Sequence, residues 1–267
     1  NSCFSKIDYR KEGRVYLGVN TAGRSAKFLL QFIIASFLQS LKDNRIQESN
    51  LDIYSTIVLY FNSLRELGGS ISLVEDDVRK TLQVIKDRRS EKERDIKLIQ
   101  ELTSRRSSIE IKETLRVLDK NLTDQNHVDV LLATNMLSVG VDIPRLGLMI
   151  VNGYPKTTAE YIQSTSRVGR KNPGLVLTLF NNNKVRDKSI FESFLPVHST
   201  LYKSVEVSSV TPFAPRSRDK SLHAPIVALY KIFYGKEAKI RINEQIAKKI
   251  ILEIINPLYE RILKIDP

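Results

Sequence analysis

Apolar and polar positions alternate along the chain in two different rhythms. In some segments, such as 26–41 and 107–118, apolar residues recur at helical spacing, which predicts helices. The others are short, mostly apolar and rich in β-branched residues, which predicts buried strands. These runs are Val15–Val19, Thr56–Phe61, Ile99–Thr103, Asp129–Thr134, Gly147–Val151 and Gly174–Phe180. Strands that alternate with helices predict an α/β fold, a parallel sheet flanked by helices.

The sequence also indicates where several helices begin or break. Ser107–Glu110 and Thr157–Glu160 both match the capping box, in which a hydroxyl and a Glu three residues later satisfy free N–H groups. They predict one helix to about Leu118 and another that runs toward Arg167. The helix that begins at Leu64 is expected to break at Gly68–Gly69, because paired glycines weaken a helix.

The strand pattern ends after about residue 184, and the remaining apolar positions have helical spacing. The sequence therefore predicts two domains, an α/β domain over residues 1–188 and a helical extension over residues 189–267. The last helix is expected between Asn243 and Leu263, where an apolar stripe is interrupted by Pro257.

Composition narrows the class of protein. The chain has 267 residues, 42% of them hydrophobic, and a net charge of +12, which favours polyanionic partners such as nucleic acid. A single cysteine, Cys3, excludes a disulfide framework and a cysteine-rich zinc site. The apolar runs are too short for a transmembrane helix, and no signal peptide is visible, so no membrane partner is expected.

One absence bears on nucleotide chemistry. None of the eleven glycines lies in the pattern G-x-x-x-x-G-K-[ST], so the sequence has no P-loop to hold phosphates. A strand-borne pair of acidic residues for Mg²⁺ is also missing.

Two segments carry candidate chemistry. In residues 133–144 a buried strand ends in a turn with small residues, Gly140 and Asp142, which suits either a ligand-binding loop or an ordinary turn. In residues 163–170, Gln163 and Arg167 are four positions apart on a predicted helix, with Arg170 just beyond it. Two guanidiniums beside an amide suit a phosphate, and the simpler alternative is a basic helix end.

Taken together, the two segments resemble motifs V and VI in the second RecA-like domain of superfamily 2 helicases. Motif V is similar to Ala133–Pro144, and motif VI to Gln163–Arg170. Thr56–Leu64 resembles motif IV, and Leu102–Arg105 with the helix after it resembles motif IVa. The order and spacing of the strands agree with this family. The resemblance implies a RecA-like fold.

The amino-acid sequences of several segments are similar to those of helicases of the DISARM phage-defence type and their relatives. These segments are Val19–Ser25, Leu102–Arg105, Ala133–Pro144, Lys156–Gln163 and Val210–Asp219. One departure from the broad superfamily is Ser166, where many members have Gly before the first arginine. It argues against the DEAD-box branch.

The resemblance implies a role for each matching residue. Arg167 and Arg170 would act as arginine fingers on the terminal phosphate of ATP, with Gln163, Gly140 and Asp142 beside the nucleotide. The nucleic-acid track would include a larger set of polar residues: Thr134, Ser138, Asn62, Ser63, Ser104 and Arg105. ATP with Mg²⁺ is the implied cofactor, bound mainly by an N-terminal RecA-like domain of the same polypeptide.

Two functions remain open at this stage. The first is the C-terminal motor half of an ATP-dependent helicase or translocase, with DNA as the expected track, a cytoplasmic location and other defence proteins as candidate partners. Because the sequence lacks a P-loop and starts at Asn1, we expect a part of a longer polypeptide that hydrolyses ATP poorly alone. The alternative is a non-catalytic nucleic-acid-binding or partner-docking module with a helicase-like fold.

Overall fold

The structure is a computed structural model. It describes residues 12–20, 23–42, 48–138, 142–206, 219–235 and 243–265. Contacts within the chain define two compact units, Asn1–Glu206 and Val207–Pro267.

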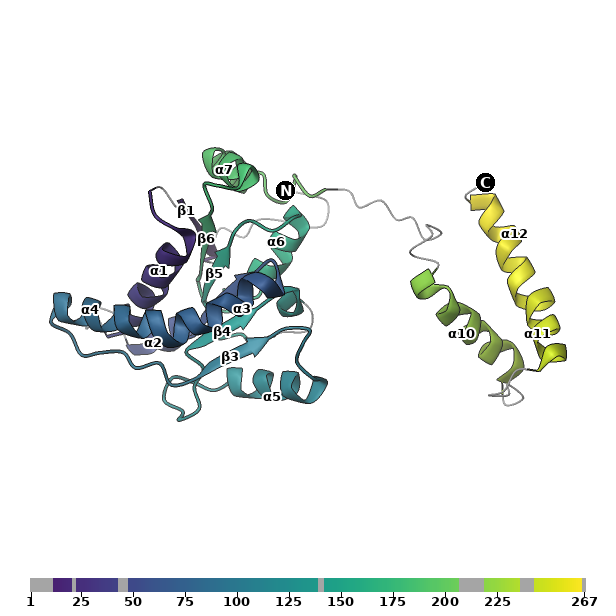
Figure 1. The fold of residues 1–267 in the computed structure, drawn as a ribbon, viewed down its shortest axis with the longest axis horizontal. Helices are drawn as coiled ribbons and strands as arrows, with labels where there is room; N and C mark the ends of the chain where they lie inside the picture. Colours follow the sequence, from purple (N-terminus) through teal and green to yellow (C-terminus); the bar gives the residue numbers. More distant parts are fainter. Residues whose placement is uncertain are drawn as a thin grey trace. The chain divides into compact units, whose positions relative to one another are not determined.

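The first unit is built on a parallel sheet, which has six strands in the described part of the chain (Figure 1). The strands are β1 (Arg14–Asn20), β2 (Ile57–Phe61), β3 (Ile99–Leu102), β4 (Val130–Ala133), β5 (Leu148–Asn152) and β6 (Gly174–Phe180). Their order across the sheet is β1-β6-β5-β2-β4-β3, and every pairing is parallel. All six strands lie where the apolar runs predicted them.

Helices connect the strands and cover both faces of the sheet (Figure 1). In the first unit they are α1 (Ala26–Ser40), α2 (Glu48–Tyr54), α3 (Leu64–Ser72), α4 (Arg79–Arg89), α5 (Ser108–Leu118), α6 (Thr158–Thr165), α7 (Val185–Glu192) and α8 (Phe194–Ser199). A π-helical segment, Leu73–Val78, joins α3 to α4. The predicted fold class, a RecA-like α/β sheet followed by a helical region, is confirmed.

Alternate residues of each strand point into two separate cores, as the pleat of a strand requires. On one face, Leu59 and Ile150 pack with α1, α3 and α4 through residues such as Ile34. On the other face, Tyr60 and Met149 pack with α5, α6 and the region after β6. The central strands are buried on both sides, which explains why their sequences are apolar throughout instead of alternating.

The expected break at Gly68–Gly69 is absent. α3 continues through both glycines to Ser72, and the helical path continues to Arg89. Each glycine costs a helix about 1 kcal/mol relative to Ala. Here Leu67, Leu73 and Val78 are fully or almost fully buried against the sheet, and this packing outweighs that cost.

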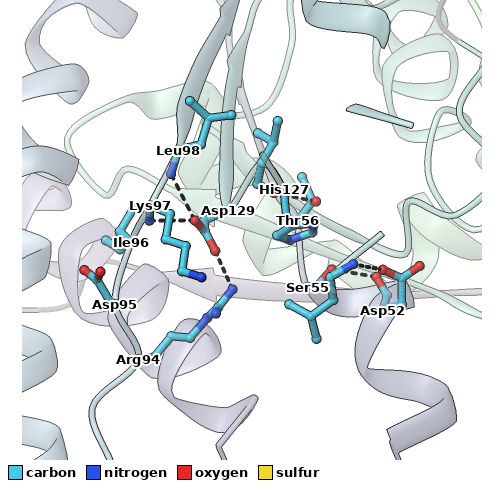
Figure 2. Close-up of polar contacts among 12 residues, drawn as sticks. Asp52, Ser55, Thr56, Arg94, Asp95, Ile96, Lys97, Leu98, His127 and Asp129 are labelled. Atoms are coloured by element: carbon cyan, nitrogen blue, oxygen red, sulfur yellow. Dashed lines mark hydrogen bonds and ion pairs between the residues drawn. The ribbon is translucent and has the colours of Figure 1, made fainter. Parts of the chain in front are cut away.

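Polar side chains join the amino ends of the central strands (Figure 2). The carboxylate of Asp129, just before β4, is 1% exposed and forms an ion pair with Arg94. It also accepts hydrogen bonds from the N–H groups of Lys97 (2.8 Å) and Leu98 (3.1 Å). This group, called the Asp129 cluster below, ties the charged segment before β3 to β4.

The first unit extends further along the chain than the predicted α/β domain, which ended at residue 188. Phe194 of α8 lies against Gly18 of β1 and stacks edge to face on Phe180 of β6. His198 of α8 hydrogen-bonds the hydroxyl of Tyr161 in α6. These contacts keep α7 and α8 with the sheet, and the compact unit ends at Glu206.

The second unit consists of helices in its described residues. They are α10 (His223–Tyr234), α11 (Glu244–Ile250), the π-helical segment Ile251–Ile255 and α12 (Asn256–Ile265). Tyr230, Ile250 and Ile254 form its buried core. Pro257 does not end the helix, because the wider π turn directly before it makes room for a residue that lacks an N–H group. None of the described helices is both long and apolar enough to cross a lipid bilayer.

Candidate nucleotide and nucleic-acid site

Arg167 and Arg170 lie in a turn that follows α6, which we call the arginine turn (residues 166–170). The helix ends at Thr165, and the N–H of Arg167 donates to the carbonyl of Ser164 at 3.1 Å. Arg167 therefore does not continue the helical face of Gln163, contrary to the expectation from their spacing. The chain tightens at the helix end, so only Gln163, which is exposed, remains on the helix.

The arginine turn contacts the connection between β4 and β5. The guanidinium of Arg167 donates to the carbonyl oxygen of Ser138, at the end of the 3₁₀ segment Asn135–Ser138. Arg170 forms an ion pair with Asp142 and donates from Nε to the carbonyl of Ser166 at 3.2 Å. The two arginines thus join segments whose contacting residues are 28 and 29 positions apart in sequence.

The two guanidiniums influence each other electrically. Partial burial, and then the positive charge of Arg170, lower the pKa of Arg167, while Asp142 opposes this effect. Arginine stays protonated at neutral pH, so two positive charges are held close together. An anionic group with several oxygens, such as a phosphate, would relieve this repulsion and accept hydrogen bonds from both side chains.

The other residues expected near the nucleotide are less informative. Asp142 is 73% exposed at its side chain and is occupied by Arg170. Gly140 lies outside the described residues. Ser138 contributes its carbonyl oxygen to the arginine turn.

A second group of expected residues lies at the carboxyl ends of β2 and β4. Thr134 is buried, and its backbone N–H donates to the carbonyl of Leu102 at 3.4 Å. The amide of Asn62 donates to two carbonyls of the turn after β5, those of Asn152 and Gly153 (3.3 and 3.1 Å). Ser63 caps α3 by accepting from the N–H of Glu66. The side chains of Asn62 and Ser63 thus already have structural contacts.

Ser104 and Arg105 lie in the turn after β3, at the same edge of the sheet. Arg105 is held by Glu101 through two hydrogen bonds of 2.5 and 2.7 Å, and Arg106 reaches the same carboxylate at 3.3 Å. Glu101 is 5% exposed, and the Arg105 hydrogen bonds hold the pKa of its carboxyl below the usual range. Arg105 therefore has a fixed position at the rim, while Ser104 is exposed.

The two groups lie toward opposite ends of the sheet. Residues 62–63, 104–105 and 134 follow the carboxyl ends of strands. The arginine turn lies near the amino ends, because α6 starts after β5 and runs back along the sheet. The N–H of Gly169 accordingly donates to the carbonyl of Leu146, just before β5, at 2.8 Å. The short segment 134–138 connects the two groups.

Sequence reasoning missed two carboxylates that shape the carboxyl edge. Glu101 positions Arg105 as described. Asp187 of α7 is 3% exposed and accepts from the N–H groups of Tyr154 (3.3 Å) and Asn181 (3.0 Å), which joins the turns after β5 and β6. Neither residue belongs to a motif, and an acidic residue within a mixed-charge sequence gives no local sign of burial.

The residues present fit the phosphate groups of a magnesium nucleotide but not its metal ion. The arginine turn suits the phosphate oxygens. No group of three or more His, Cys, Asp or Glu side chains that could hold a metal ion occurs among the described residues. The donor set for the metal is thus not found in this part of the chain.

Comparison with known protein families indicates the class of protein. Residues 59–172 match the family model described as the helicase conserved C-terminal domain. Residues 59–172 therefore resemble the C-terminal domain of superfamily 2 helicases, and the sheet that contains them is RecA-like.

Among known proteins, the chain is 46% identical over 231 residues to the DISARM protein DrmA of Bacillus paralicheniformis. The match covers 85% of this chain and 20% of DrmA. Two crystal structures of the DUF1998 helicase MrfA, one bound to DNA and one bound to DNA and AMPPNP, share the fold. Their TM-scores are 0.56 and 0.54 at 18% and 19% identity. Each match covers 90% of this chain and 30% or 29% of MrfA, so the chain spans less than a third of either relative.

Proposed function

We propose that this chain is the C-terminal motor half of an ATP-dependent nucleic-acid helicase or translocase. It supplies Arg167 and Arg170 to an ATP site and polar residues at the carboxyl edge to a nucleic-acid track. The observation that carries the proposal is the arginine turn, where two guanidiniums lie against the β4–β5 connection. A module that only binds or docks has no need for two arginines at this spacing.

The proposed roles follow the geometry. Arg167 and Arg170 would bind phosphate oxygens and stabilise the negative charge that develops during hydrolysis, an effect worth about 10³–10⁵ in rate in related NTPases. Asp142 orients Arg170, and the carbonyl of Ser138 orients Arg167. Gln163 is exposed near the turn and would help orient the network. Gly140 keeps the role near the nucleotide that the resemblance implies.

At the opposite edge, the track would run over the ends of β2, β3 and β4. Thr134, Asn62, Ser63, Ser104 and Arg105 are the proposed contacts to the backbone of the nucleic acid at this edge. Ser138, the remaining residue proposed for the track, lies at the other end of the segment 134–138, where its carbonyl bonds Arg167. Contacts to the backbone alone suit a motor that moves over any sequence. The net charge of +12 favours such contacts and makes them dependent on salt.

The site is incomplete without a second domain. The sequence has no P-loop, and the described residues hold no metal-binding cluster. A first RecA-like domain would supply both, as part of the same polypeptide. ATP with Mg²⁺ would then bind between the two domains. The likeness to the DISARM protein DrmA supports a role in phage defence, where other defence proteins are the candidate partners. MrfA, which shares the fold, is bound to DNA in its crystal structures, and this supports DNA as the track.

The test is nucleic-acid-stimulated ATP hydrolysis by the parent polypeptide, with DNA and RNA compared. Arg167→Ala and Arg170→Ala should each lower turnover by at least about 10²-fold, while nucleic-acid binding persists. Arg88→Ala, at an exposed position of α4, is the matched control and should behave as wild type. Wild-type protein without stimulated turnover, or arginine variants that match it, would refute the motor function and favour the docking alternative.

A further inference from the structure

The arginine turn lies against strand β1, the edge strand beside β6. The first residue of this strand, Arg14, is half-buried and is separated from the turn by more than 150 residues of sequence. Its Nε donates to the carbonyl of Val168 at 2.7 Å, and its Nη2 reaches the carbonyl of Ser166 at 3.4 Å. These two carbonyls belong to the residues on either side of Arg167.

The turn is also packed tightly against the strands. Gly169 has a φ of +65°, which is strained for other residues, and a Cβ there would lie 2.7 Å from the Cα of Gly174 and 3.1 Å from the Cγ of Arg14. Val168 is completely buried in the core. The backbone between the two arginines thus has one available path, and Arg14 forms one side of it.

A second residue of β1 contacts the end of the helix. Tyr16 lies two positions after Arg14, on the same face of the strand, and its hydroxyl is 3.3 Å from Oγ1 of Thr165. Arg14 and Tyr16 therefore hold consecutive parts of the chain, the last helical residue and the turn that follows.

We propose that Arg14 is a positioning residue for Arg167 and Arg170, so that β1 sets the geometry of the arginine turn. This inference rests on the proposed function. Arg14 lies behind the turn and acts through the backbone, since its guanidinium is occupied by the two carbonyls. Arg14 would therefore affect the rate of turnover. A displacement of about 1 Å in a catalytic group, such as the guanidinium of Arg167, lowers the rate by about 10²-fold.

The shape of the side chain matters as well as its charge. A guanidinium spans two acceptors with separate nitrogens, whereas the ammonium of a lysine is a single point. Arg14→Lys keeps the charge and one hydrogen bond, and Arg14→Gln loses the charge and the span. The expected order of turnover is wild type, then Arg14→Lys, then Arg14→Gln.

The experiment measures ATP hydrolysis by the parent polypeptide with saturating nucleic acid. Arg14→Gln should lower kcat by about 10-fold to 10²-fold, with the KM for ATP and the Kd for nucleic acid within about two-fold of wild type. Arg79→Gln is the matched control. Arg79 also donates to a carbonyl, that of Ile96 at 2.7 Å, but is remote from the turn, and this variant should keep wild-type kcat.

Two further measurements separate positioning from general damage. Hydrogen exchange at Gly169, whose N–H bonds to the carbonyl of Leu146, should become faster in Arg14→Gln and not in Arg79→Gln. Combining Arg14→Gln with Arg167→Ala should lower turnover by less than the product of the two single losses, because one of the two positioned groups is already missing.

The outcomes are distinguishable. If Arg167→Ala loses turnover while Arg14→Gln keeps wild-type kcat, the positioning role is wrong and the proposed function stands. The positioning role is also wrong if Arg79→Gln loses as much kcat as Arg14→Gln, or if the double variant multiplies the two losses. If wild-type protein shows no stimulated turnover, the proposed function fails and the positioning role fails with it.

Discussion

The Asp129 cluster gives a direct test of how the sheet is held at its amino edge (Figure 2). The perturbation is Asp129→Asn, which keeps the shape of the side chain and removes its charge. The carboxylate has acceptors on both sides, one toward Arg94 and one toward the N–H groups of Lys97 and Leu98. An asparagine amide has an acceptor on one side only, so in either orientation its NH₂ group faces a donor.

The magnitude follows from burial. The side chain of Asp129 is 1% exposed and that of Arg94 is 11% exposed, so water screens the pair poorly. Removing one partner of such a pair typically costs about 3–5 kcal/mol, because the remaining charge stays buried. A domain of this kind has a total stability of about 5–15 kcal/mol. The variant should therefore fold but lose a large share of its stability.

The assay is urea unfolding of the full chain followed by circular dichroism. Hydrogen exchange at the amides of β3 and β4 distinguishes the first unit from the helical second unit. The control is Asp95→Asn, whose carboxylate is 72% exposed and pairs with Arg79, and which should change stability by less than about 1 kcal/mol. The double variant Arg94→Met/Asp129→Asn should be more stable than Asp129→Asn, because the donor conflict disappears.

Equal unfolding midpoints for Asp129→Asn and Asp95→Asn would refute the reasoning. The reasoning would also be wrong if the double variant lost as much stability as the single variants Arg94→Met and Asp129→Asn added together. Residues in direct contact are expected to be coupled by about 0.5–3 kcal/mol.

Two further predictions concern carboxylates of the first unit. The pKa of Glu101 is held below its usual range mainly by Arg105, so the stabilisation is present above the unfolded pKa of about 4.3 and is lost as the pH falls through the folded pKa. The free energy of unfolding of wild type minus that of Glu101→Gln, measured with urea between pH 3 and 7, should decrease as the pH falls. A difference that does not change with pH would contradict the prediction. Glu206 accepts from the N–H and hydroxyl of Thr158 at the start of α6, so Glu206→Gln should lower local stability by about 0.5–1 kcal/mol. Faster hydrogen exchange in the first turn of α6 would show it, with the exposed Glu192→Gln as control; unchanged exchange would disprove the cap.

The four central strands, β2, β4, β5 and β6, were predictable because burial on both faces leaves a continuous apolar run. The helix starts were predictable only in part. The capping box at Ser107 is complete, with Glu110 returning a hydrogen bond to the N-cap. At Thr157 only half of the box forms, because the carboxylate of Glu160 accepts from the hydroxyl of Tyr60 on β2 instead. A partner 100 residues away decides between the two, and no local pattern reveals it.

The same limit applies to the site. The segments that carry Asp142 and the two arginines were recognisable from their amino-acid sequences as similar to helicase motifs V and VI. The structure brings these segments together. That Arg167 leaves the helix depends on a turn held by Arg14 and by the close contact of Gly169 with Gly174. Those contacts join distant parts of the chain. They become visible only when the order of the strands places β1 beside β6.

Under the proposed function, the arrangement also suggests how the two groups of residues communicate. The segment 134–138 bonds to β3 through the N–H of Thr134 at one end and to Arg167 through the carbonyl of Ser138 at the other. A change at the phosphate that moves Arg167 therefore acts on a connection of five residues that ends at the nucleic-acid edge. Because Val168 and Gly169 are held against the strands, the movement must come from the side chain of Arg167 and from this connection, and not from the turn as a whole. In the proposed motor, a rigid turn behind a short connection would let the nucleotide state alter the contacts to the nucleic-acid strand.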